Sequence, residues 1–294
     1  MNIENNKMSW LNYIFSKKEK HVIRGTKIVI INNTDSPNKE FIRACILEFC
    51  NRVPMMRLIP KAVFYIEDFK KPFAHIGEIA LAYVERKNNL HVHVNVEIKT
   101  KEKMFNLLAH EISHYKKREI SIINIRVRQR ISKSIKKLGI INYYRLYLRD
   151  FIFAVLDEGY ATFNGYTLIG KVKFNNDEFL RYYNLAKNEA EEFMSIWSKY
   201  VAFYQAKDPR YGGLVNSLET LYKRSYKIGF HIHYTLVYSN KHVKIDDKIF
   251  NIIKIYEATI ISMGYKPIIS VNSGKGILDY NSLIASWYNL HKNS

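Results

Sequence analysis

The chain has 294 residues, of which 47% are hydrophobic and 25% are charged, and its formal net charge is +19. This composition is typical of a soluble globular protein and excludes a disordered or collagen-like chain. No apolar run has the length of a membrane-spanning helix, and the N-terminal residues lack the layout of a signal peptide, so we expect a cytoplasmic protein without a membrane span. Two cysteines, Cys45 and Cys50, are too few for a disulfide framework or a cysteine-based zinc site.

The first hundred residues predict strands mixed with one helix. A buried strand is expected at 27–32, a helix at 38–51 and a second strand at 62–66. Two longer strands, at 75–85 and 90–99, are separated by a Lys-Asn-Asn turn that favours a hairpin. Together with the helices predicted downstream, this order indicates an α+β fold with a small twisted sheet.

The strand expected at 90–99 alternates between apolar and polar side chains. One face carries Val92, Val94, Val96 and Ile98, and the other carries His91, His93, Asn95 and Glu97. Two histidines on one face can indicate a metal site. Because period-two alternation already accounts for them, we expect this face to be the solvated side of the sheet.

A helix expected from Thr100 onward carries the most informative stretch of the chain. Thr100 can cap the helix and Glu102 suits its first turn. The helix contains His-Glu-x-x-His at His110, Glu111 and His114. Residues four apart lie on one helical face, so the two histidines can present their imidazoles to one metal ion. Glu111 projects beside them, where a carboxylate can take a proton from a metal-bound water.

A catalytic zinc ion needs three protein ligands, and Glu158 is the best candidate for the third. Glu158 lies in a helix expected at about 142–163, on a face shared with apolar side chains. A carboxylate on such a face is costly unless it binds a cation, or pairs with a lysine or arginine, which is the alternative reading. Gly159 lets another backbone or the metal site come close. Asp157 is the alternative ligand, or an acceptor that orients a histidine.

A strongly basic stretch separates the two predicted ligand helices. Residues 116–149 contain eleven Lys or Arg and a single acid, Glu119, and an amphipathic helix is expected at 121–138. Such a charge favours polyanions, although it is also compatible with a simply solvated face. The alternative function is therefore a basic nucleic-acid-binding protein with a structural or vestigial zinc site. The sequence contains no recognisable DNA-binding or RNA-binding motif in its support.

The C-terminal part is expected to be mostly helical, with helices at 177–205, 213–238 and 244–263 and a less regular tail. The tail contains Ser-Gly-Lys-Gly at 273–276. This run lacks the glycine spacing and the strand-to-helix context of a phosphate-binding loop.

The motif at 110–114, followed by Glu-Gly-x-Ala at 158–161, resembles the gluzincin zinc metallopeptidases, the thermolysin-like zincins. The matching residues cover a small part of the chain. The resemblance implies a zincin-like sheet with an active-site helix, a zinc ion (Zn2+) held by His110, His114 and Glu158, and a protein or peptide substrate. It also implies hydrolysis by a metal-activated water with Glu111 as general base.

Gluzincins with Glu-Gly-x-Ala often carry Tyr-x-x-Gly on a later helix, where the tyrosine hydroxyl stabilises the transition state. Tyr226-Lys227-Ile228-Gly229 matches this pattern, and His231 and His233 are alternative donors. The Gly-x-Met-Glu-Asn motif of the aminopeptidase branch has no counterpart in the sequence, so the resemblance favours an endopeptidase.

Three parts are therefore expected. Residues 1–25 form an N-terminal segment that could pack on the body as a short helix or could cover the cleft, and a cover would make the enzyme latent. Residues 26–170 form a zincin-like catalytic subdomain that contains both ligand helices. Residues 171–294 form a helical subdomain that completes the cleft.

Overall fold

The structure is a computed structural model, and it describes residues 17–68, 82–86, 89–116, 140–210, 212–213, 226–241, 249–272 and 274–291. The chain divides into two compact units. The sheet unit consists of Met1–Arg118 with Asn164–Lys171, and the helical unit consists of Glu119–Phe163 with Val172–Ser294. Residues 140–163, the described part of a stretch that we expected within the catalytic subdomain, therefore cluster with the C-terminal helices.

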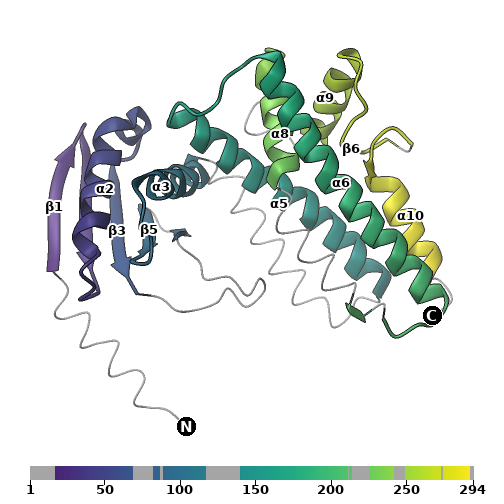
Figure 1. Cartoon of the computed structure of the whole chain (residues 1–294), viewed down its shortest axis with the longest axis horizontal. Helices are drawn as coiled ribbons and strands as arrows, with labels where there is room; N and C mark the ends of the chain where they lie inside the picture. The colour runs from purple at the N-terminus through teal and green to yellow at the C-terminus, as the bar shows by residue number, and fades with distance from the viewer. Residues whose placement is uncertain are drawn as a thin grey trace, which may run out of the picture. The chain divides into compact units, whose positions relative to one another are not determined.

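Within the described residues, the sheet unit is built on a five-stranded mixed sheet with the strand order β1-β2-β3-β5-β4 (Figure 1). The strands are β1 (Lys17–Ile23), β2 (Thr26–Asn32), β3 (Lys61–Glu67), β4 (Ala82–Arg86) and β5 (Leu90–Asn95). The three central strands are parallel, and an antiparallel strand pairs at each edge. An α+β fold is thus confirmed.

The predicted strands match the sheet in position more closely than in length. The strands expected at 27–32 and 62–66 are confirmed as β2 and β3. The hairpin is confirmed by the antiparallel pairing of β4 with β5, while residues 75–81 lie outside the described residues. β5 ends at Asn95, earlier than expected, because the Asn95 side chain accepts a hydrogen bond from the Glu97 amide and turns the chain.

Part of the N-terminal segment belongs to the sheet. Residues 1–16 lie outside the described part of the chain. The residues that follow form β1, which pairs with β2 along its whole length, from Lys17 opposite Asn32 to Ile23 opposite Thr26. This part of the segment is an edge strand of the sheet.

One face of the sheet carries α2 (Lys39–Arg52) and α3 (Lys101–Lys116), which form a single apolar core with the strands (Figure 1). The strands contribute Ile28, Ile30, Ala62, Phe64, Ile66, Val92 and Val94, and the helices contribute Ile42, Ile46, Phe49, Met104, Leu108 and Ile112. The apolar face predicted for the β5 region is therefore confirmed as the core face. The short 3-10 helix η1 (Pro54–Leu58) links α2 to β3.

The start of α3 is held by side-chain hydrogen bonds. The Asn38 amide, just before α2, donates to the carbonyls of Val96 and Ile98 in the connection from β5. The Thr100 hydroxyl accepts a hydrogen bond from the Lys103 amide at 3.3 Å, which confirms Thr100 as the cap of this helix. These contacts fix where α3 begins relative to the sheet.

The polar face of β5 differs from the expectation of a solvated surface. His93 is only 6% exposed, and its Nδ1 lies 2.8 Å from a carboxylate oxygen of Glu67 on β3. Its ring stacks on Tyr65, with the ring centroids 4.3 Å apart. The expectation is wrong for His93 because the parallel register of β3 and β5 places Tyr65 directly beside it. His91 also contacts this tyrosine, with its Nδ1 3.1 Å from the hydroxyl.

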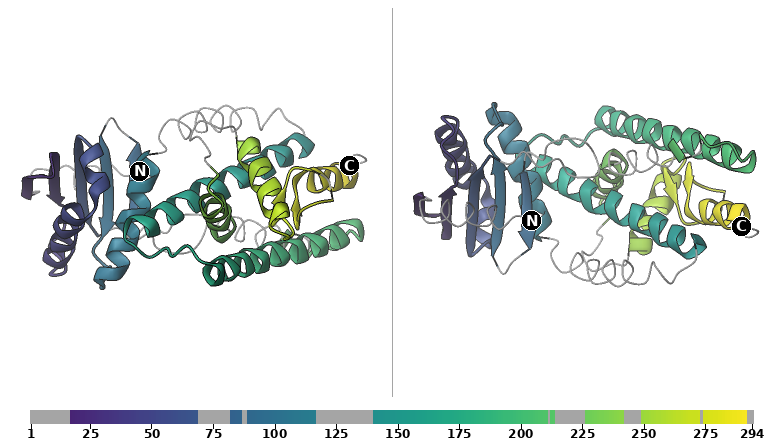
Figure 2. Two further views of the ribbon diagram at one scale, coloured as in Figure 1. Left: turned by 90° about the horizontal axis from the view of Figure 1, so that it is seen from above. Right: turned by 90° about the horizontal axis from the view of Figure 1, so that it is seen from below.

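The helical unit contains most of α5 (Ile140–Leu168), followed by α6 (Asn176–Gln205), α8 (Tyr226–Tyr238), α9 (Ile249–Ser262) and α10 (Tyr280–His291). Figure 2 shows α6, the long green helix, along its full length. The helices expected around α5, α6, α8 and α9 are confirmed where the structure describes them, whereas the helix expected at 121–138 lies outside the described residues. Among the described helices, none is both long and apolar enough to cross a membrane.

The C-terminal tail is more regular than expected. Two short parallel strands, β6 (Ile269–Ser270) and β7 (Leu278–Asp279), precede α10. Asp279 caps α10, because its carboxylate accepts a hydrogen bond from the Ser282 amide at 2.9 Å. The prediction of an irregular tail was wrong because this cap was not recognised.

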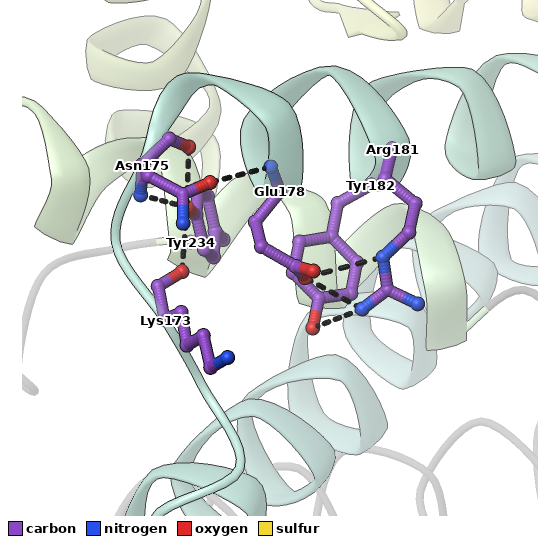
Figure 3. Close-up of polar contacts among 6 residues, drawn as sticks. All are labelled: Lys173, Asn175, Glu178, Arg181, Tyr182 and Tyr234. Carbon is purple, nitrogen blue, oxygen red and sulfur yellow. Dashed lines mark hydrogen bonds and ion pairs between the residues drawn. The ribbon is translucent and has the colours of Figure 1, made fainter.

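A hydrogen-bond network fixes the start of α6 on α8 (Figure 3). Asn175 caps α6 by accepting a hydrogen bond from the Glu178 amide at 2.8 Å. The Tyr234 hydroxyl of α8 donates to the Lys173 carbonyl at 2.9 Å and accepts from the Asn175 amide at 3.3 Å. Arg181 forms an ion pair with Glu178 at 2.6 Å. Tyr234 therefore joins α8 to the start of α6 within the helical unit.

Candidate metal centre

The two motif histidines face each other on α3. His110 and His114 are both half-buried, and their Nε2 atoms lie 3.1 Å apart. Two nitrogens bound to one tetrahedral zinc ion, each at its usual bond length, would be separated by about 3.3 Å. The pair therefore fits a shared metal ion, and the separation would also allow a hydrogen bond between a protonated and an unprotonated nitrogen.

The apolar face of α3 determines where these histidines point. Met104, Leu108 and Ile112 follow one another at four-residue spacing, and all three are fully buried in the core of the sheet unit. His110 lies two residues after Leu108, on the opposite side of the helix from this face. Glu111 follows His110 in the helix and is half-buried.

The last turn of α5 docks on α3 within the sheet unit. The Asn164 amide donates a hydrogen bond to the Ser113 hydroxyl at 2.8 Å, and this hydroxyl donates to the Ala109 carbonyl at 2.7 Å. A Cβ atom at Gly165 would lie 3.0 Å from the backbone of Ala109 and His110. The sequence reasoning missed these contacts, because it ended the helix at residue 163. The sequence signal for them is Gly165, a residue without a side chain, directly after the polar Asn164.

Glu158 lies in α5, as predicted, six residues before Asn164 on the same unbroken helix. Its side chain is half-buried, and its backbone carbonyl accepts a hydrogen bond from the Thr162 hydroxyl at 2.9 Å. Val155, one turn earlier, is 1% exposed, which agrees with the inward-facing side predicted for this helix. Asp157 is also half-buried.

The prediction that Gly159 admits another backbone is confirmed within the helical unit. A Cβ atom at Gly159 would lie 2.2 Å from the backbone carbon of Gly229, and one at Gly229 would lie 1.8 Å from the Val155 carbonyl oxygen. α5 and α8 therefore cross with their backbones in contact. The glycines of Glu-Gly-x-Ala and Tyr-x-x-Gly are the two residues that make this crossing possible.

The three candidate transition-state donors lie on α8 in different surroundings. Tyr226 is the first residue of the helix and is 39% exposed. His233 places its Nε2 3.1 Å from the Leu156 carbonyl of α5. His231 is packed against the rings of Phe179, Tyr183 and Tyr256, and its burial lowers its pKa to about 3. His231 is therefore an uncharged core residue at neutral pH, and Tyr226 and His233 remain the candidate donors.

The comparisons of this chain with protein-family models, with curated proteins and with solved structures found no match. The candidate centre is therefore inferred from the residues of this chain alone. The structure does not test what the basic stretch at 116–149 binds, because residues 117–139 and the side chains of 140–149 lie outside the described residues. The nucleic-acid alternative stays a prediction.

Proposed function

We propose that the protein is a zinc-dependent peptidase in which His110, His114 and Glu158 hold the metal ion. The observation that carries the proposal is the 3.1 Å separation of the two histidine Nε2 atoms, which suits two ligands of one ion. Among the described residues, these three side chains form a group whose ligand atoms could serve a single ion. Two imidazoles and one carboxylate, with one position open for water, are the usual ligands of a catalytic zinc ion.

Each further residue has a chemical role in this proposal. Zinc, when bound, acidifies a water molecule and polarises the scissile carbonyl. Glu111 accepts the proton of the attacking water and passes it to the leaving amine. Tyr226 donates a hydrogen bond to the oxygen that becomes negatively charged in the transition state.

The position of β4 supports a peptide as the substrate. Among the described strands, β4 lies at one edge of the sheet, and α3 packs against both β4 and β5. An edge strand offers backbone donors and acceptors that an extended peptide can pair with. A peptide held there would lie beside the motif helix, and the lack of a Gly-x-Met-Glu-Asn motif favours an endopeptidase.

The proposal is tested by metal analysis and by hydrolysis of an unstructured protein such as casein. We expect the purified wild type to contain about one zinc ion per chain, as a three-ligand catalytic site requires. Glu111→Gln should keep the zinc and lose hydrolysis by about 100-fold or more, because it removes the general base. His110→Ala and Glu158→Ala should lose the zinc.

The matched control is Glu97→Gln, which changes an exposed glutamate of the sheet unit and should alter neither zinc content nor hydrolysis. A wild type that is free of zinc after purification, and that takes up none when zinc is added, would overturn the proposal. Full hydrolysis by Glu111→Gln would overturn the role given to Glu111.

A further inference from the structure

A buried polar contact joins the motif helix to the helix that carries Glu158. Ser113 is fully buried on α3, between the two motif histidines in sequence. Its hydroxyl accepts a hydrogen bond from the Asn164 amide at 2.8 Å and donates one to the Ala109 carbonyl at 2.7 Å. The hydroxyl hydrogen is therefore used within α3, and a lone pair of the hydroxyl oxygen accepts the hydrogen bond from Asn164 of α5.

We propose that Ser113 and Asn164 are positioning residues that set the register of α5 on α3 and thereby place Glu158 at the metal ion. The inference rests on the proposed function, since it assigns the contact a role at the same site. Neither residue touches the metal or the substrate in this assignment.

Helix geometry explains why the register matters. Glu158 precedes Asn164 by six residues, which is about 9 Å along a continuous helix. A slip of α5 by one residue would move Glu158 by about 1.5 Å along the helix axis and turn it by about 100°. Because a metal site tolerates errors in ligand distance of only about 0.2 Å, such a slip would remove the carboxylate from the ion.

The neighbouring glycine makes the contact sensitive to spacing. At Gly165 an added Cβ would lie 3.0 Å from the backbone atoms of Ala109 and His110, which is closer than ordinary van der Waals contact. The two helices can approach closely enough for the Asn164 amide to reach Ser113 because residue 165 has no side chain. Gly165 therefore belongs to the same positioning contact.

The test measures the zinc affinity of the full chain by competition with a chelator. We expect Asn164→Leu and Ser113→Ala each to weaken zinc binding by about 10-fold or more, the usual effect of losing a group that orients a metal ligand. Thr26→Val is the control, because it also removes a buried hydrogen bond in the sheet unit, from the Thr26 hydroxyl to the Met56 carbonyl, and should leave zinc affinity unchanged.

A double substitution separates positioning from a merely structural role. In a Glu158→Ala background, Asn164→Leu should cause no further loss of zinc affinity, because there is no carboxylate left to place. Gly165→Ala serves if Asn164→Leu does not fold. It retains every hydrogen-bonding group and should weaken zinc binding only when Glu158 is present. Thermal unfolding in chelator reports the metal-free stability of each variant.

The outcomes distinguish this inference from the proposed function. A wild type that binds no zinc overturns both. Zinc binding that depends on Glu158 but is unaffected by the Asn164, Ser113 and Gly165 substitutions overturns the inference alone. An equal loss of affinity from Asn164→Leu with and without Glu158 also overturns it, because the contact would then support the fold and not the carboxylate.

Discussion

Gly159 of α5 and Gly229 of α8 meet with their backbones in direct contact inside the helical unit, and a side chain at either position would overlap the other helix. The contact gives a structural reason for the glycines of the Glu-Gly-x-Ala and Tyr-x-x-Gly patterns. It also relates two candidate functional residues, because Glu158 directly precedes Gly159 and Tyr226 lies one turn before Gly229. Both candidates are thus placed by the same helix crossing.

Gly159→Ala and Gly229→Ala should each destabilise the protein by about 2–3 kcal/mol, because the added methyl group forces two tightly packed helices apart. Urea unfolding followed by circular dichroism measures the effect. Gly213→Ala is the control, since a Cβ at that helical position meets nothing within 4 Å and should be neutral or slightly stabilising. Equal stability of all three variants would contradict the crossing.

His231 should make the stability of the protein depend on pH. Burial lowers its pKa from 6.5 to about 3, so the unfolded chain binds a proton at His231 before the folded chain does. The stability is therefore complete above about pH 6.5 and falls as the pH decreases towards 3, at up to roughly 1.4 kcal/mol per pH unit. Unfolding in urea at pH 7 and pH 4.5 should show a smaller pH effect for His231→Leu than for wild type.

Zinc should stabilise the folded chain. An ion that binds only the folded state, at 100 times its dissociation constant, adds about 2.7 kcal/mol to the free energy of unfolding. The melting temperature should therefore rise with zinc and return to its starting value with chelator. Magnesium should have little effect, because it prefers oxygen ligands to imidazole. A zinc response that persists in His114→Ala would contradict the assigned ligands.

Tyr226→Phe should lower kcat by about 100-fold with zinc content and KM little changed, because the hydroxyl acts on the transition state and not on the bound substrate. Steady-state hydrolysis of a peptide substrate measures both constants. Tyr288→Phe removes a hydroxyl from a tyrosine that is 52% exposed, and it should behave as wild type. An unchanged kcat in Tyr226→Phe would move the donor role to His233.

The regular elements were predictable where the apolar period was strong. The strands at 27–32 and 62–66 and the rotation of α3 follow directly from the spacing of their apolar residues, so the placement of His110 and His114 on one face was predictable too. The face of β5 that carries His93 was not, because its burial depends on Glu67 and Tyr65 from a strand distant in sequence.

The end of α5 shows how tertiary contacts override local signals. Asn164-Gly165 has the composition of a helix stop, yet the helix continues because the glycine fits against the backbone of α3. The true stop is Gly170, which has a φ of +73° and is followed by a hydrogen bond of 2.8 Å from the Lys171 amide to the Tyr166 carbonyl. Only the second glycine lies where a left-handed residue is required.

The participation of α5 in both units has a consequence for dissecting the protein. Residues 140–163 of α5 belong to the helical unit, but Leu168 and Ile169, at and just after its end, pack on the core of the sheet unit. Lys171 forms an ion pair with Glu102 of α3 at 2.6 Å. The units are interleaved along the polypeptide, so no single cut yields two intact pieces. A fragment that stops at residue 118 would lack Leu168 and Ile169, which cover part of its apolar core, and we expect it to aggregate when expressed alone.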